Sequence, residues 1–174
     1  MAFSLKFDDK KLSTSVWPPL PTLDDKKAEI YKKINFITAV NILKGFDYEF
    51  KGTTYHFSFD SEDQSNFTQE KIRATKAVED GKKDEYVAYW RGHVGNKAYT
   101  LQFNYDEFID LLMFSGENKS KQLGTGWVLK DKIAACETKL EVDEMVKTLK
   151  IDELERAARD IVDELGLAIK LEDM

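Results

Sequence analysis

The chain has 174 residues, of which 42% are hydrophobic, 12% aromatic and 33% charged. This composition is typical of a globular protein and excludes an intrinsically disordered chain. The net charge is −6, and no basic stripe is present, so nucleic-acid binding is not expected. No apolar run approaches the length that spans a bilayer, so membrane insertion is not expected either.

The chain contains a single cysteine, Cys136, which cannot form an internal disulfide. It lies in an apolar stretch, so a buried, unreactive thiol is expected. The N-terminus lacks the long apolar core of a signal peptide. We therefore expect synthesis and folding in a cytoplasm.

Residues 1–23 are predicted to form an extended arm. Phe3, Leu5 and Phe7 alternate with polar residues, and three prolines follow between Val16 and Pro21. Consecutive prolines fix an extended backbone without sheet donors. An arm of this kind is expected to dock on a neighbouring chain, although Trp17 could instead fold back onto its own domain. The predicted contact residues of the arm are Phe3, Phe7, Trp17, Pro18, Pro19 and Leu20.

Residues 24–149 are predicted to form an α+β domain that starts with a helix from about Asp24 to Leu43. Thr22 or Asp24 caps this helix, and Gly45 ends it. A β-hairpin follows, with a tight turn at 51–52. One face of this hairpin is aromatic and is expected to anchor the core; it carries Phe46, Tyr48, Phe50, Tyr55, Phe57 and Phe59.

The second half of this domain is predicted as a helix, a second hairpin and further helices. Ser61 and Gln64 fit a capping box that opens the helix, and residues 80–83 end it. The second hairpin has strands at 86–91 and 97–103, joined by a turn at 92–96. The fold class is therefore α+β: helix, β-hairpin, helix, β-hairpin (a small antiparallel sheet), followed by several helices.

The helices after the second hairpin are punctuated by glycines. Asn104 caps the first of them, which either stops near Ser115 and Gly116 or continues. The run 124–126, Gly-Thr-Gly, favours a break or kink before a further helix at 127–136. Thr138 then caps a short helix that reaches about Leu149.

Residues 150–174 are predicted to form an acidic C-terminal helix, with four basic and eight acidic side chains. Apolar residues recur seven apart in two series offset by three, which is the pattern of a coiled-coil seam. The helix either packs on its own domain or contacts a partner or a second copy. The predicted partner contacts are Ile151, Leu154, Ile161 and Leu165.

Residues from about Ala28 to Val146 resemble the DUF4376 family, a domain of uncharacterised biochemistry found in tail-fibre and other tail-associated proteins of tailed bacteriophages. The matching positions occur in the same order along the chain. They are Gly45, Phe46, Tyr48, Gly52, Phe57, Asp60, Gln64, Asn66, Phe67, Trp90, Asn96, Leu101, Phe108, Ile133, Ala134, Ala135, Thr138 and Glu141. The glycine-rich and polar run 115–126 departs from the continuous helix that the resemblance implies.

The sequence contains no recognisable catalytic apparatus. His56 falls on the polar side of its predicted strand and His93 in a predicted turn, so both are expected at the surface. Zinc-ligand spacing is missing, and no phosphate-binding glycine loop is present. We expect no catalytic residue, cofactor or metal ligand, although the sequence leaves a sugar-cleaving carboxylate pair open.

The resemblance and the two unusual chain ends together imply a structural component of a bacteriophage virion, at its tail, baseplate or fibre attachment region. The protein would be made in the bacterial host cytoplasm and would bind other virion proteins, and possibly copies of itself, through its ends. One alternative is a receptor- or glycan-binding module that recognises a host-surface glycan. That alternative requires exposed aromatic residues in a groove, from the set Tyr55, Phe57, Tyr89, Trp90 and Tyr99. A second alternative is a tail-fibre assembly chaperone.

Overall fold

The structure is a computed structural model and describes residues 20–167. The predicted α+β class is confirmed. The chain runs α1 (Leu23–Leu43), β1 (Phe46–Phe50), β2 (Thr53–Phe57), α2 (Ser61–Glu79), a short 3-10 turn (Lys83–Glu85), β3 (Ala88–Val94), β4 (Lys97–Phe103), α3 (Tyr105–Ala134), α4 (Lys139–Thr148) and α5 (Ile151–Leu165). Most of the predicted arm, residues 1–19, lies outside the described residues.

The four strands form one antiparallel sheet in the order β1-β2-β3-β4. Within each hairpin the pairing is extensive: β1 and β2 pair from Phe46 with Phe57 to Phe50 with Thr53. Between the hairpins a single pair, His56 with His93, joins β2 to β3. The first half of β3 is therefore unpaired on its β2 side.

The turns of the two hairpins differ in how well the sequence predicts them. Lys51 and Gly52 both have positive φ, of 51° and 78°, as a two-residue type I′ turn requires. The second turn is shorter than expected, because β3 continues through Gly92 and His93 to Val94. Gly92 lies within this strand, and a β-carbon there would lie 2.9 Å from Tyr55 Cβ, so the missing side chain makes room for Tyr55.

The predicted N-terminal caps are confirmed for three helices, and the cap of a fourth lies one residue earlier than predicted. Thr22, Asn104 and Thr138 cap α1, α3 and α4. The cap of α2 is Asp60 rather than Ser61: its carboxylate accepts from the Asp63 backbone N–H at 2.8 Å. Asp60 is the favoured cap because the Asp63 side chain, three residues on, also accepts a hydrogen bond from the Asp60 backbone N–H. The two reciprocal bonds complete the capping box.

Helix α3 is continuous for 30 residues, so the break predicted at 124–126 is wrong. The glycine at 126 has a packing role instead. A β-carbon there would lie 2.5 Å from Thr38 Oγ1 on α1, and the missing side chain lets the two helices approach closely. Ser115, which was a candidate helix end, is buried within α3, and its hydroxyl donates to the Leu112 carbonyl at 2.8 Å.

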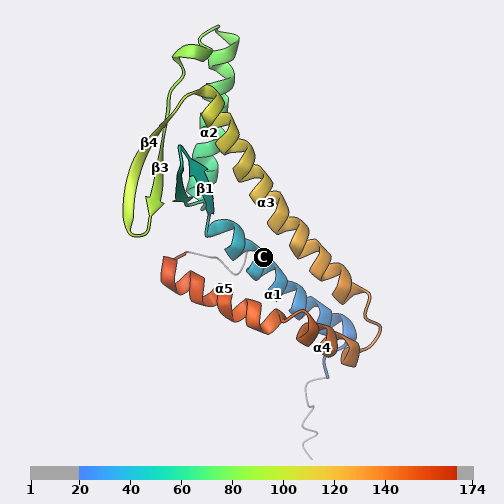
Figure 1. Cartoon of the computed structure of the whole chain (residues 1–174). Helices are drawn as coiled ribbons and strands as arrows, with labels where there is room; N and C mark the ends of the chain where they lie inside the picture. Colours follow the sequence, from blue (N-terminus) through green and yellow to red (C-terminus); the bar gives the residue numbers. More distant parts are fainter. Residues whose placement is uncertain (1–19, 168–174) are drawn as a thin grey trace, which may run out of the picture.

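The core consists of two hydrophobic clusters that share α1 and α3 (Figure 1). The first lies where α2 and the start of α3 cover the aromatic face of the sheet, around Phe57, Phe67, Phe103 and Phe108. The second lies among most of α1, from Ile30 to Val40, the end of α3, α4 and α5. Cys136 is buried in this second cluster, as predicted.

Helix α5 lies along α1 (Figure 1). It is anchored by Ile151, which is wholly buried, and by Ala158. Lys33 Nζ of α1 bridges to Asp152 at 2.7 Å and to Glu155 at 3.5 Å. In this structure the apolar seam of α5 is therefore used, at least in part, within its own chain. Among the described helices, none is sufficiently long and apolar to cross a membrane.

Candidate functional site

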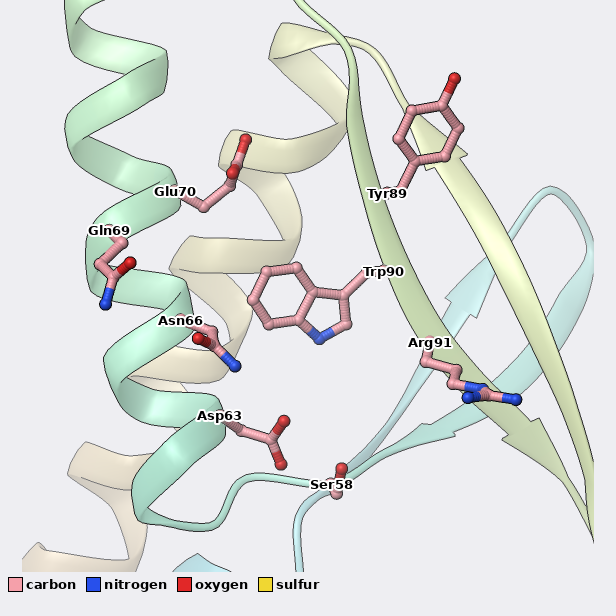
Figure 2. Close-up of a pocket in the computed structure, with 8 residues that line it drawn as sticks. All are labelled: Ser58, Asp63, Asn66, Gln69, Glu70, Tyr89, Trp90 and Arg91. Atoms are coloured by element: carbon pink, nitrogen blue, oxygen red, sulfur yellow. The ribbon is translucent and has the colours of Figure 1, made fainter.

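A polar groove of about 380 Å³ lies between α2 and β3. It opens where β2 has ended and the chain turns into α2, beside the unpaired half of β3. Figure 2 shows eight residues that line it. They are Ser58, Asp63, Asn66, Gln69, Glu70, Tyr89, Trp90 and Arg91.

The helical wall of the groove follows from the spacing of α2. Asp63, Asn66 and Glu70 are three and four residues apart, so they lie on one face of the helix. All three extend toward the groove, whereas the amide of Gln69 turns away from it (Figure 2). Phe67 lies on the core side of the same helix and is buried.

Trp90 forms the aromatic centre of the groove. Its indole lies against Phe67, with ring centroids 4.0 Å apart, and near Phe108 at 6.1 Å. These contacts fix the ring in position, while the residue stays partly exposed. The indole nitrogen faces the end of the groove where Asp63 and Ser58 lie (Figure 2).

Glu70 is held in place by two neighbours. The Tyr86 hydroxyl donates to Glu70 Oε1 at 2.6 Å, and the Arg73 guanidinium pairs with the same oxygen. Burial raises the pKa of Tyr86 well above its ordinary value, and the hydrogen bond to the Glu70 carboxylate raises it further. Arg73 also donates to the Val87 carbonyl, which ties α2 to the chain entering β3.

Several polar side chains of the groove make no hydrogen bond or ion pair within the described part of the chain. Neither the Asn66 amide nor the Arg91 guanidinium makes a hydrogen bond or ion pair there. Tyr89 is 65% exposed. Tyr89 and Arg91 extend from the other side of β3 from Trp90, since strand residues alternate (Figure 2). Of these groups, the Asn66 amide lies on the same side of β3 as the Trp90 ring, so it is an uncommitted donor and acceptor beside that ring.

The two acidic residues of the groove can be compared with the carboxylate pair of a sugar-cleaving enzyme. Asp63 and Glu70 are seven residues apart on one helix, which separates their backbones by about 10 Å along the axis. Glycosidase carboxylates lie about 5 Å apart in retaining enzymes and about 6.5–9.5 Å apart in inverting ones. Among residues 20–167, no group of three or more His, Cys, Asp or Glu is placed to hold a metal.

The two histidines face each other across β2 and β3. His56 Nδ1 lies 2.8 Å from Asp47 Oδ1, and its Nε2 lies 2.9 Å from the Lys44 carbonyl oxygen. The prediction that His93 lies in a turn is wrong, because β3 extends past it. Both histidines are partly exposed.

The predicted partner-binding residues fall into three groups. Phe3, Phe7, Trp17, Pro18 and Pro19 lie outside the described residues. Leu20, Leu154 and Leu165 are 86%, 40% and 50% exposed, so they are accessible. Ile151 is buried against its own chain, and Ile161 packs against the same cluster. The structure therefore gives these last two residues an internal role.

The aromatic residues predicted for a glycan groove differ in location. Tyr89 and Trp90 line the groove, whereas Phe57 is fully buried. Tyr55 and Tyr99 pack against each other edge to face, with centroids 5.7 Å apart. The polar wall on α2 was not predicted as a site. Its only sequence signal is the series of polar residues at helical spacing that flanks Phe67.

The chain matches no protein-family model, no curated protein and no solved structure. The resemblance to DUF4376 therefore stays a prediction that depends on the residues quoted above. No function carries over from a relative.

Proposed function

We propose that this protein is a non-enzymatic component of a tailed-bacteriophage virion that acts by subunit assembly. The bacteriophage context comes from the resemblance to DUF4376. The assembly role is supported by one observation in particular, the outer face of α3, which the described residues leave uncovered.

The outer face of α3 combines large apolar side chains with small residues. Met113, Trp127 and Val128 are 59%, 62% and 54% exposed. Between them, Gly116, Ser120 and Gly124 are spaced four apart, so they share this face. An exposed tryptophan on such a face is typical of a protein interface.

The two glycines of this face have no neighbour among the described residues that would exclude a side chain. A β-carbon at Gly116 or Gly124 would meet no atom within 4 Å. Each glycine costs about 1 kcal/mol relative to alanine inside a helix. Close approach of a helix from a neighbouring subunit is a reason to retain them, since small residues allow two backbones to come near.

The chain ends supply further contacts in this proposal. Leu20, Leu154 and Leu165 present apolar surface that the described residues leave open. The aromatic and proline-containing arm, residues 1–19, would add to it. Aromatic residues dominate the energetics of many protein interfaces.

The decisive experiment is incorporation into purified particles, measured by mass spectrometry. Wild-type protein is expected in the particle, whereas Trp127→Ser protein should fold normally but be depleted from it. Tyr89→Ser, which changes an equally exposed aromatic residue elsewhere, is the matched control and should be incorporated normally.

Truncation tests the arm separately. Protein lacking residues 1–21 should remain folded but fail to enter particles, and normal incorporation would refute the role of the arm. If the wild-type protein is required for assembly yet missing from the finished particle, virion membership is refuted and an assembly chaperone is favoured.

A further inference from the structure

We propose that the groove between α2 and β3 binds a pyranose ring of an uncharged glycan. This inference is independent of the assembly role and rests on the shape, aromatic floor and polar rim of the groove. Its volume of about 380 Å³ lies in the range of small-ligand sites.

The aromatic floor is the first argument. The apolar C–H face of a pyranose stacks on a flat aromatic ring, and Trp90 supplies the largest such ring. Phe67 packs at 4.0 Å between ring centroids and keeps the indole from turning. A ring that is already ordered loses little conformational entropy when a ligand stacks on it.

The polar rim is the second argument. Neighbouring hydroxyl groups of a sugar both donate and accept hydrogen bonds, and they suit planar amide, carboxylate and guanidinium groups. Asn66, Glu70 and Asp63 extend from α2 toward the Trp90 ring (Figure 2). Asn66 has no partner in the described chain, so it can serve a ligand without giving up an internal bond.

The orientation of Glu70 is fixed in advance. One of its oxygens, Oε1, accepts from Tyr86 and Arg73, which leaves Oε2 for a ligand hydroxyl. Because Tyr86 stays protonated, this donor persists throughout the neutral pH range. Preorganised acceptors of this kind favour binding.

The charges of the groove argue against other ligand classes. Asp63 and Glu70 would repel phosphate or sulfate groups. Arg91 is the one cationic residue among the lining side chains, so the acidic side chains outnumber it. Glu70 is already paired with Arg73, so the attraction for a cationic ligand is reduced. An apolar ligand would leave the amide and carboxylate groups unsatisfied. A neutral polyhydroxylated ring carries no charge for the carboxylates to repel, and its hydroxyl groups satisfy the amide and carboxylate groups.

The test uses the full-length protein on an array of neutral glycans, followed by saturation-transfer NMR with the methyl glycosides of the sugars that bind. We expect binding to neutral pyranosides and none to an array of phosphorylated or sulfated glycans. Trp90→Ala should weaken binding about tenfold or more, the equivalent of one lost stacking contact.

Two further variants separate binding from folding. Asn66 is exposed and has no described partner, so Asn66→Ala should fold normally and still bind less tightly. Trp127→Ala changes an exposed tryptophan on α3, away from the groove, and should bind like the wild type.

Three results would overturn the proposal. The first is no binding of the wild-type protein to any neutral glycan. The second is binding that both Trp90→Ala and Asn66→Ala leave unchanged, which would place the sugar elsewhere. The third is a preference for charged glycans. None of them bears on incorporation into particles, which Trp127→Ser tests.

Discussion

The hydroxyl oxygen of Thr38 lies 2.5 Å from the position that a β-carbon at Gly126 would occupy. This relationship sets the separation of α1 and α3, the two helices that both hydrophobic clusters share. Glycine is thus retained at position 126 by packing rather than by a turn.

Substitution of Gly126 by alanine should destabilise the protein. The added methyl group would overlap the Thr38 side chain, and overpacking of this kind costs about 1–3 kcal/mol. Thermal unfolding measures the loss. Because the nearest atoms belong to the hydroxyl and methyl groups of Thr38, the double variant Gly126→Ala with Thr38→Ala should recover much of it. If the double variant is no more stable than Gly126→Ala, this packing argument fails.

The other two glycines of α3 should behave in the opposite way. Gly116→Ala and Gly124→Ala meet no neighbouring atom, and each should raise the free energy of unfolding by about 0.5–1 kcal/mol through helix propensity. Denaturant titration of the isolated protein provides the measurement. The same variants should lower incorporation into particles if a neighbouring helix approaches there. Stabilisation with normal incorporation would contradict the proposed use of this face.

Substitutions of apolar residues of α5 should change the free energy of unfolding according to how buried each side chain is. Ile151→Ala removes a fully buried side chain and should cost about 3 kcal/mol. Leu154→Ala, at a side chain that is 40% exposed, should leave the free energy of unfolding nearly unchanged. Chemical denaturation compares the two, and sedimentation analysis tests whether Leu154 contributes to self-association. Equal losses of stability in both variants would show that α5 packs differently.

Tyr86 should make stability depend on alkaline pH. Burial and the Glu70 carboxylate raise the pKa of Tyr86 in the folded protein, whereas the unfolded chain has an ordinary value of about 10. The stabilisation is therefore complete below about pH 10 and is lost as the pH rises through the folded-state pKa.

The corresponding variant is Tyr86→Phe, which should cost about 2 kcal/mol at neutral pH and flatten the decline in stability above pH 10. Stability as a function of pH, from urea titrations, provides the measurement. Tyr89→Phe alters an exposed phenol and serves as the control. An unchanged alkaline decline in Tyr86→Phe would contradict the role assigned to this hydrogen bond.

The sequence predicts local structure best where one residue type has one physical use. The positive φ of Gly52 and the aromatic alternation around Phe57 identify the first hairpin directly. The Gly-Thr-Gly run wrongly predicts a helix break, because glycine is used both in turns and where two helices come close together. Only the position of Thr38 on α1 shows that Gly126 has the second use. Gly92 likewise wrongly predicts a turn, because its glycine makes room for Tyr55 within β3.

The groove was beyond the reach of sequence patterns because its two walls are distant in the chain. Trp90 and Asn66 come together only when α2 and β3 pack on the same aromatic cluster. Exposure was equally hard to predict for α5, where the heptad pattern does not distinguish the buried Ile151 from the accessible Leu154. A tertiary neighbour, α1, makes that distinction.

The single pair between His56 and His93 has a mechanical consequence for the groove. Each hairpin has its own complete set of backbone bonds, so a change in the angle between the two hairpins would break few of them. The distance from Trp90 to the helical wall therefore depends mainly on side-chain packing around Phe67 and Phe59. Of the dimensions of the groove, its width is the one held by side-chain contacts, above all by the packing of Phe67 on Trp90.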